Sequence, residues 1–128
     1  MEIVTKNFKA NKEGKLDADM VSELRPIEGH DEVVVKFKHL SGGEINKYID
    51  ANTRDYDFTS MFRKKVISIE GIDLKDEDGN KIDVTPEVLT IVACPLFDKI
   101  IYKTCGHLIE SYTMTKEEEK NLNGDSRL

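Results

Sequence analysis

The feature that most constrains this chain is a pair of helical patterns in its last third, residues 85–122. Thr85-Pro86 predicts a helix start, because a threonine side chain caps the first turn and proline suits the first helical position. Pro95 is expected to end or kink that helix. After it, apolar side chains recur at helical spacing, namely Phe97, Ile100, Ile101, Leu108, Ile109 and Tyr112. Neither helix has a catalytic residue type at its centre, which favours a protein that works by surface contact.

Two strands are expected ahead of these helices. From Val33 to Lys38, β-branched and aromatic side chains alternate with mostly charged ones, which is the clearest strand pattern in the chain. Residues 2–8 alternate weakly and could pair with that strand. Residues 9–32 are polar, and the regular element considered there is a short helix at 16–24.

The middle of the chain has a helix-start signal and a hairpin signal. Ser41 and Glu44 have the spacing of a capping box, which predicts a helix near residues 42–50. Asp78-Gly79, with apolar residues on both sides, predicts a small hairpin.

Between these two signals, apolar side chains from Phe58 to Ile69 follow helical spacing. Gly71 favours this helix, because glycine often ends one. The β-branched run at residues 66–69 leaves a strand there as the alternative.

The fold class predicted from these signals is α+β, with a small N-terminal β element followed by three to four packed α-helices. The length of 128 residues suits a single domain, 1–128. Within it we expect a polar N-terminal extension that could contain a strand (1–32), a core (33–114) and a charged, partly frayed tail (115–128).

Charge and composition argue against several classes of partner. A formal net charge of −6 is unfavourable for binding nucleic acid, and the basic run Arg63-Lys64-Lys65 is interpreted as the solvated face of a helix. No apolar run reaches the ~18 residues that span a membrane, and the N-terminus lacks the apolar region of a signal peptide. With two cysteines, the chain is expected in a reducing cytoplasm, that of a bacterial host cell.

Residues that could bind a metal or catalyse a reaction do not form a recognised motif. The acidic turn at 76–80 lacks the acidic ligands that a calcium loop needs at its two ends. Cys94, Cys105 and His107 lack the close spacing of a zinc site and the signature of a cysteine nucleophile. The glycine-rich Ser41-Gly42-Gly43 lacks the rest of a phosphate-binding loop and suits a helix cap better. We therefore expect no enzyme activity, cofactor or metal.

Two groups of apolar residues are candidates for surface contact. Those that could bind a partner, or form the core, are Phe58, Phe62, Leu96, Phe97 and Ile101. Those that could form homo-oligomers, if their strand lies at a sheet edge, are Val33, Val35 and Phe37.

Three stretches have the order and character of one known family. They are residues 33–44, then 66–72 with Asp78-Gly79 and Thr85-Pro86-Glu87, then 108–112 with 115–121. Together they resemble the tail assembly chaperones of long-tailed bacteriophages and prophages, over residues 33–121. Residues 1–32 are longer and more polar than the family pattern.

This resemblance implies a small helical protein that binds the tape-measure protein, keeps it soluble, helps to recruit the tail-tube protein and leaves before the tail matures. The alternative is a structural minor tail or connector protein that is retained in the virion. A small enzyme or metal protein is a third hypothesis.

Overall fold

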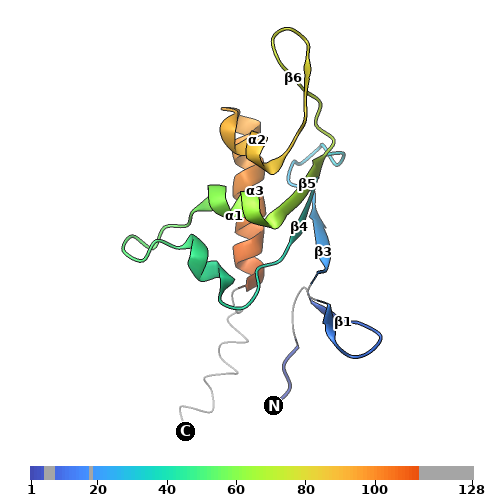
Figure 1. The fold of residues 1–128 in the computed structure, drawn as a ribbon, viewed down its shortest axis with the longest axis vertical. Coiled ribbons are helices and arrows are strands. Elements are labelled where there is room, and N and C mark those ends of the chain that lie inside the picture. The colour runs from blue at the N-terminus through green and yellow to red at the C-terminus, as the bar shows by residue number, and fades with distance from the viewer. Residues whose placement is uncertain (5–7, 18, 113–128) are drawn as a thin grey trace.

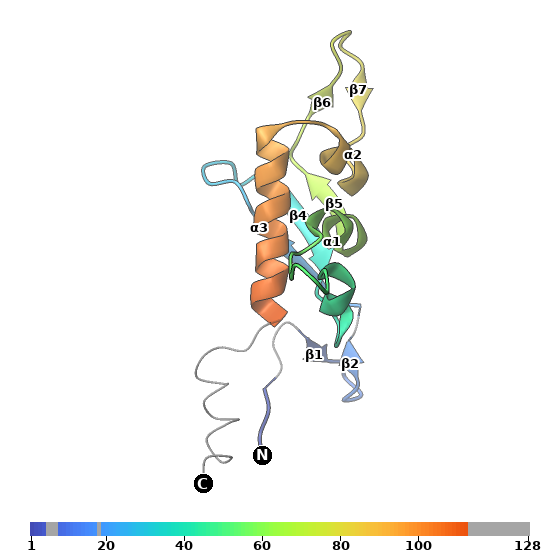
Figure 2. The same cartoon turned by 90° about the vertical axis from the view of Figure 1, so that its left-hand side faces the viewer.

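The computed structural model describes residues 1–4, 8–17 and 19–112. Within them, three α-helices and one 3₁₀ helix accompany three small antiparallel sheets (Figures 1 and 2). None of these helices is both long and apolar enough to cross a membrane. The elements in chain order are β1 (Lys9–Ala10), β2 (Leu16–Asp17), β3 (Val21–Leu24), β4 (Val34–Lys38), η1 (Glu44–Tyr48), α1 (Phe58–Lys65), β5 (Val66–Glu70), β6 (Leu74–Lys75), β7 (Lys81–Ile82), α2 (Pro86–Ile91) and α3 (Pro95–Tyr112).

The central sheet has the strand order β3-β4-β5, so β4 pairs on both of its edges. Val35 and Phe37 of β4 are completely buried and belong to the main core. Between them, Lys36 points to the other face of the sheet, where its ammonium group lies 3.1 Å from the carboxylate of Glu70. The alternation in the sequence therefore predicted the buried face of this strand correctly.

The helices cover the buried face of the sheet. In Figure 1, α1 and α2 lie side by side in front of the long α3, and the contacts between the three helices agree with this view. α3 turns a regular stripe of side chains toward the core, formed by Phe97, Ile100, Thr104 and Leu108. The ring of Phe37 lies 5.6 Å from that of His107, which places β4 against the C-terminal half of α3.

The predicted architecture is wrong in its proportions. Strands dominate the N-terminal part of the chain, and 22% of the structure is strand against 34% helix, with three α-helices. Residues 16–17 form β2 and residues 21–24 form β3, where a helix was expected. Residues 2–4 and 8 lie outside any strand, while 5–7 and 18 are not described. The reason is that β1 and β2 are exposed on both faces, so no hydrophobic alternation marks them in the sequence.

The helix expected from Phe58 to Ile69 is also shorter than its apolar spacing suggests. α1 ends at Lys65 and β5 begins at the next residue, so the strand alternative for residues 66–69 is the correct one. Gly71 does not end a helix. It has a φ of +84°, and a Cβ atom there would overlap the backbone carbonyl of Glu32, so a close approach of two chain segments requires glycine.

Several local predictions are confirmed. The Thr85 side chain accepts a hydrogen bond from the Val88 N–H at 3.2 Å, and Pro86 opens α2. The Asp78-Gly79 turn joins β6 to β7. The capping box at Ser41 is confirmed only in part. Glu44 accepts a hydrogen bond from the Ser41 N–H at 2.9 Å, but the element that follows is the short 3₁₀ helix η1, whose N-cap is Gly43 with no side-chain capping hydrogen bond.

The prediction that Pro95 ends or kinks the helix before it is wrong. Pro95 occupies the first residue of α3, so it begins a helix, and α2 has already ended at Ile91. The expected charged tail at 115–128 lies outside the described residues.

Candidate partner-binding surface

The five residues proposed for partner binding separate into core and surface. Phe62 and Phe97 are buried and belong to the main core. Phe58 and Ile101 are half-buried and pack against that core, while the Leu96 side chain is 40% exposed. The residues that retain surface for a partner are therefore Phe58, Leu96 and Ile101.

Phe58 lies at the centre of three aromatic rings, which we call the aromatic cluster: Tyr56, Phe58 and Tyr102. Tyr56 stacks on Phe58 with 5.9 Å between ring centroids and 16° between ring planes. Tyr102 meets Phe58 edge-on at 5.7 Å. Tyr56 is 38% exposed and Tyr102 is 67% exposed, so the cluster presents two large aromatic side chains to solvent.

Local structure holds this cluster in place. The Asp57 carboxylate caps α1 by accepting a hydrogen bond from the Ser60 N–H at 3.1 Å, which fixes Phe58 as the first helical residue. The buried Cys105 thiol donates to the Phe58 carbonyl at 3.4 Å and so ties α1 to α3. The cluster therefore bridges two helices that are distant in sequence.

Sequence reasoning missed both tyrosines of this cluster. Tyr102 falls off the stripe of α3 that contains Phe97, Ile100 and Leu108, and a bulky aromatic outside the buried stripe is a usable signal of a surface role. Tyr56 lies between η1 and α1, where no periodicity applies.

A second apolar surface lies where α2 meets α3. We call it the junction patch, and it consists of Ile91, Val92 and Leu96. Ile91 is 72% exposed, which is unusual for isoleucine. Leu96 and Tyr102 are six positions apart on α3, so at about 100° per residue they face different directions. The aromatic cluster and the junction patch are therefore separate surfaces.

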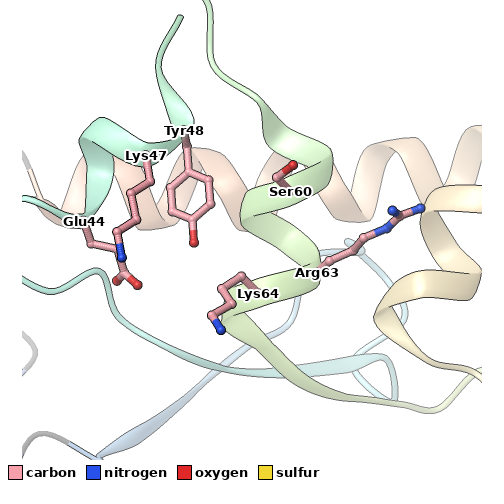
Figure 3. A pocket seen from close by; sticks show the side chains of 6 residues that line it. All are labelled: Glu44, Lys47, Tyr48, Ser60, Arg63 and Lys64. Atoms are coloured by element: carbon pink, nitrogen blue, oxygen red, sulfur yellow. The ribbon is translucent and has the colours of Figure 1, made fainter.

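The basic run Arg63-Lys64-Lys65 does not form one solvated face. Lys65 is half-buried and its ammonium lies 2.9 Å from the Glu44 carboxylate. Arg63 donates from Nε to the Thr90 hydroxyl at 2.6 Å. Lys64 is exposed at the rim of a surface hollow. This hollow, the basic hollow, is lined by Glu44, Lys47, Tyr48, Ser60, Arg63 and Lys64 (Figure 3).

Glu44 and Tyr48 are the two side chains of this hollow that can lose a proton to become negative. Burial acts to raise the pKa of the Glu44 carboxyl, but hydrogen bonds from Lys65 and Ser41 outweigh burial and bring the pKa below its ordinary value. Burial, together with the charge of Glu44, raises the pKa of the Tyr48 phenol. At neutral pH the Glu44 carboxylate is charged and Tyr48 is a neutral hydrogen-bond donor.

The candidate metal and nucleophile residues are dispersed. Burial, assisted by the charge of Asp57, raises the pKa of the Cys105 thiol to about 12, which leaves it a poor nucleophile at neutral pH. Cys94 lies between α2 and α3 and is half-buried. Among the described residues, no three His, Cys, Asp or Glu side chains lie close enough together to hold a metal ion.

Two histidines from distant segments meet beneath the sheet. His39 and His107 both lie edge-on to Phe37, and the His39 ring forms a 2.8 Å hydrogen bond between Nε2 and the Ser22 hydroxyl. Its Nδ1 is buried and has no protein partner among the described residues. Burial is the main cause that lowers the pKa of His39, and the charges of His107 and Lys65 lower it further. This ring is therefore neutral at physiological pH.

The acidic turn at 76–80 uses its first carboxylate internally. Oδ1 of Asp76 accepts hydrogen bonds from the backbone N–H groups of Asp78 and Asn80, at 2.9 and 2.8 Å. The amide side chain of Asn80 donates to Oδ2 at 3.2 Å. This carboxylate therefore stabilises the turn.

The residues proposed for self-association, Val33, Val35 and Phe37, are all buried. Val35 and Phe37 belong to β4, and Val33 directly precedes it. β4 lies between β3 and β5, so its backbone hydrogen-bonding groups pair within the chain on both edges. The expected free edge at this strand is therefore absent, because residues 21–24, predicted as helix, provide the missing neighbour.

No family model, curated protein or solved structure matches this chain.

Proposed function

We propose that this protein is a non-enzymatic tail assembly chaperone, which binds the tape-measure protein of a long-tailed bacteriophage while the tail is being built. The observation that carries the proposal is the aromatic cluster, in which Tyr56 and Tyr102 are held against Phe58 on the surface. Tyrosines on a rigid support are favourable anchors for a protein partner, because each buries much apolar area with little loss of side-chain entropy.

The chemistry of this surface suits reversible contact. Each tyrosine has an apolar ring and a hydroxyl that water can solvate, so the surface tolerates exposure when the partner leaves. A chaperone that is absent from the finished tail needs this property.

A second partner has a surface available. The junction patch of Ile91, Val92 and Leu96 lies apart from the aromatic cluster, so the tail-tube protein could be recruited while the tape-measure protein is bound. The resemblance of residues 33–121 to phage chaperones names these two partners.

The test is co-expression with the tape-measure protein encoded immediately downstream of this gene. The intact chain should keep the tape-measure protein soluble and co-purify with it. The double variant Tyr56→Ala/Tyr102→Ala should weaken binding by roughly 1,000-fold, because truncating a buried aromatic anchor typically costs ~2 kcal/mol and each tenfold in affinity corresponds to ~1.4 kcal/mol.

The matched control is Lys103→Ala, which changes an exposed residue of α3 beside Tyr102. This variant should bind normally. Absence of a tape-measure gene nearby, or a wild-type chain that forms no complex, would reject the proposal.

Mass spectrometry of purified phage particles separates the proposed chaperone from the alternative, a minor tail or connector protein. A chaperone should be missing from mature particles. Detection of the chain at fixed stoichiometry would favour the connector.

A further inference from the structure

The basic hollow between η1 and α1 concentrates positive charge on a chain whose formal net charge is −6. Its volume is about 460 Å³, and its lining contributes three cations, Lys47, Arg63 and Lys64. One carboxylate, Glu44, also lines it. This carboxylate is paired at 2.9 Å with Lys65, a residue outside the lining, so the charge of Glu44 is already offset.

The donors of the hollow are largely uncommitted. Within the described part of the chain, neither Lys47 nor Lys64 forms an ion pair. The Nε–H group of Arg63 donates to the Thr90 hydroxyl, and the other N–H groups of its guanidinium remain as further donors. In Figure 3 the ring of Tyr48 descends from η1 into the space facing Lys64, while the Arg63 side chain extends away from that space toward α2, where Thr90 lies.

A nearby acidic side chain, Asp57, offsets one of these charges, because its carboxylate interacts electrostatically with Arg63, and this leaves Lys47 and Lys64 as the cations in excess. The Asp57 carboxylate is bound to its own helix, where it accepts from the Ser60 hydroxyl at 2.6 Å and from the Ser60 N–H at 3.1 Å. Both oxygens therefore serve the start of α1.

We propose that the basic hollow binds carboxylate groups of an acidic protein segment. Two lysine ammonium groups, an arginine and a tyrosine hydroxyl are all hydrogen-bond donors to anions, and Lys47 and Lys64 face the gap from opposite elements. The hollow is separate from the aromatic cluster, and the proposal does not depend on the identity of the partner bound there.

An acidic protein segment fits better than nucleic acid. Nucleic acid binding requires a track of cations along a phosphate backbone, whereas three cations in one hollow can neutralise only a few charges. The net charge of −6 also repels a long polyanion before contact, while a short acidic segment experiences mainly the local field. The hollow also neighbours the aromatic cluster, a surface suited to protein contact. The two are joined through the backbone, because the Tyr48 carbonyl accepts a hydrogen bond from the Asp57 N–H at 2.7 Å and Asp57 follows Tyr56 in the chain.

The test is a titration of the full-length, ¹⁵N-labelled chain with a hexaglutamate peptide, followed by NMR. Backbone amide shifts should concentrate at residues 47–48 and 60–64 and should weaken as salt is added. The double variant Lys47→Ala/Lys64→Ala should bind the peptide about fivefold more weakly, because exposed ion pairs contribute modestly.

The matched control is Lys99→Ala/Lys103→Ala, which removes the same charge from exposed positions on α3. This variant should bind hexaglutamate as the wild type does. An equal loss in both double variants, or shifts spread over lysines throughout the chain, would overturn the proposal. A hexathymidine oligonucleotide that moves the same resonances more strongly than hexaglutamate would also overturn it, in favour of nucleic acid.

Discussion

The central sheet β3-β4-β5 and the ribbon β6–β7 use the same antiparallel hydrogen bonding, but they bury very different amounts of apolar surface. β4 contributes fully buried Val35 and Phe37 to the core, whereas the paired residues Lys75 and Lys81 of the ribbon are exposed. In Figures 1 and 2 the ribbon projects from one end of the molecule, away from the helices.

Different forces therefore specify the two regions. The ribbon relies on the turn, where the Asp76 carboxylate binds two backbone N–H groups and Gly79 adopts a φ of +86°. The central sheet relies on packing, because β5 contacts α1 and α2, and Phe37 of β4 packs against His107 of α3. Damage to one region should therefore have a larger effect than the same damage to the other.

The largest effect is expected from proline in the central strand. Val35→Pro removes a ladder donor in a strand that is paired on both sides, and it also removes a buried side chain, so the chain should fail to fold. Circular dichroism and NMR dispersion measure this outcome.

The matched change in an exposed ribbon is Lys9→Pro in β1, which should cost about 1 kcal/mol or less, as for one exposed hydrogen bond. A folded Val35→Pro variant would show that β4 is not an internal strand.

A smaller difference in stability is expected between alanine variants of Gly71 and Gly79, two glycines with similar φ angles. Gly71→Ala places a methyl group into the Glu32 carbonyl and also strains φ, so it should lower the free energy of unfolding by about 3 kcal/mol. Gly79→Ala in the ribbon turn has open space around it and should cost only about 1 kcal/mol of backbone strain. Urea denaturation of the two variants gives the comparison directly, and equal losses would contradict the close approach at Gly71.

The smallest expected effect concerns acid. The pKa of Glu44 lies below its ordinary value of 4.5, so its ion pair with Lys65 stabilises the fold above that pH and is lost as the pH falls through the folded value. Glu44→Gln should therefore lower stability at pH 7 by about 1 kcal/mol, and its difference from the wild type should shrink at pH 3.

The corresponding change in the ribbon is Asp76→Asn. Hydrogen bonds from Asn80 lower the pKa of this exposed carboxyl, so the sign of the effect is the same, and its size should be smaller. Urea midpoints at pH 7 and pH 3 test both variants. A greater loss from Asp76→Asn than from Glu44→Gln would reverse the proposed ranking of the two regions.

The candidate site could be predicted only in part, and Phe58 illustrates why. Its spacing marks it as apolar and helical, but its neighbours in the aromatic cluster come from a loop and from α3, 44 residues later in the case of Tyr102. Phe62 shares the helical pattern of Phe58 and is completely buried. Periodicity identifies residues on the apolar face of a helix. Whether such a residue is exposed depends on which other helices and strands pack over it.

The sequence by itself determined the local features that depend on neighbours a few residues away. These include the cap of α2 at Thr85, the turn at Asp78-Gly79 and the alternation of β4, since each uses hydrogen bonds or side-chain geometry within a short segment. Only the tertiary structure decided that β4 is the central strand, that residues 66–70 leave the helical pattern for β5, and that Gly71 lies against Glu32. These outcomes depend on apolar burial between distant segments, and this long-range packing overrides local propensity wherever the two differ.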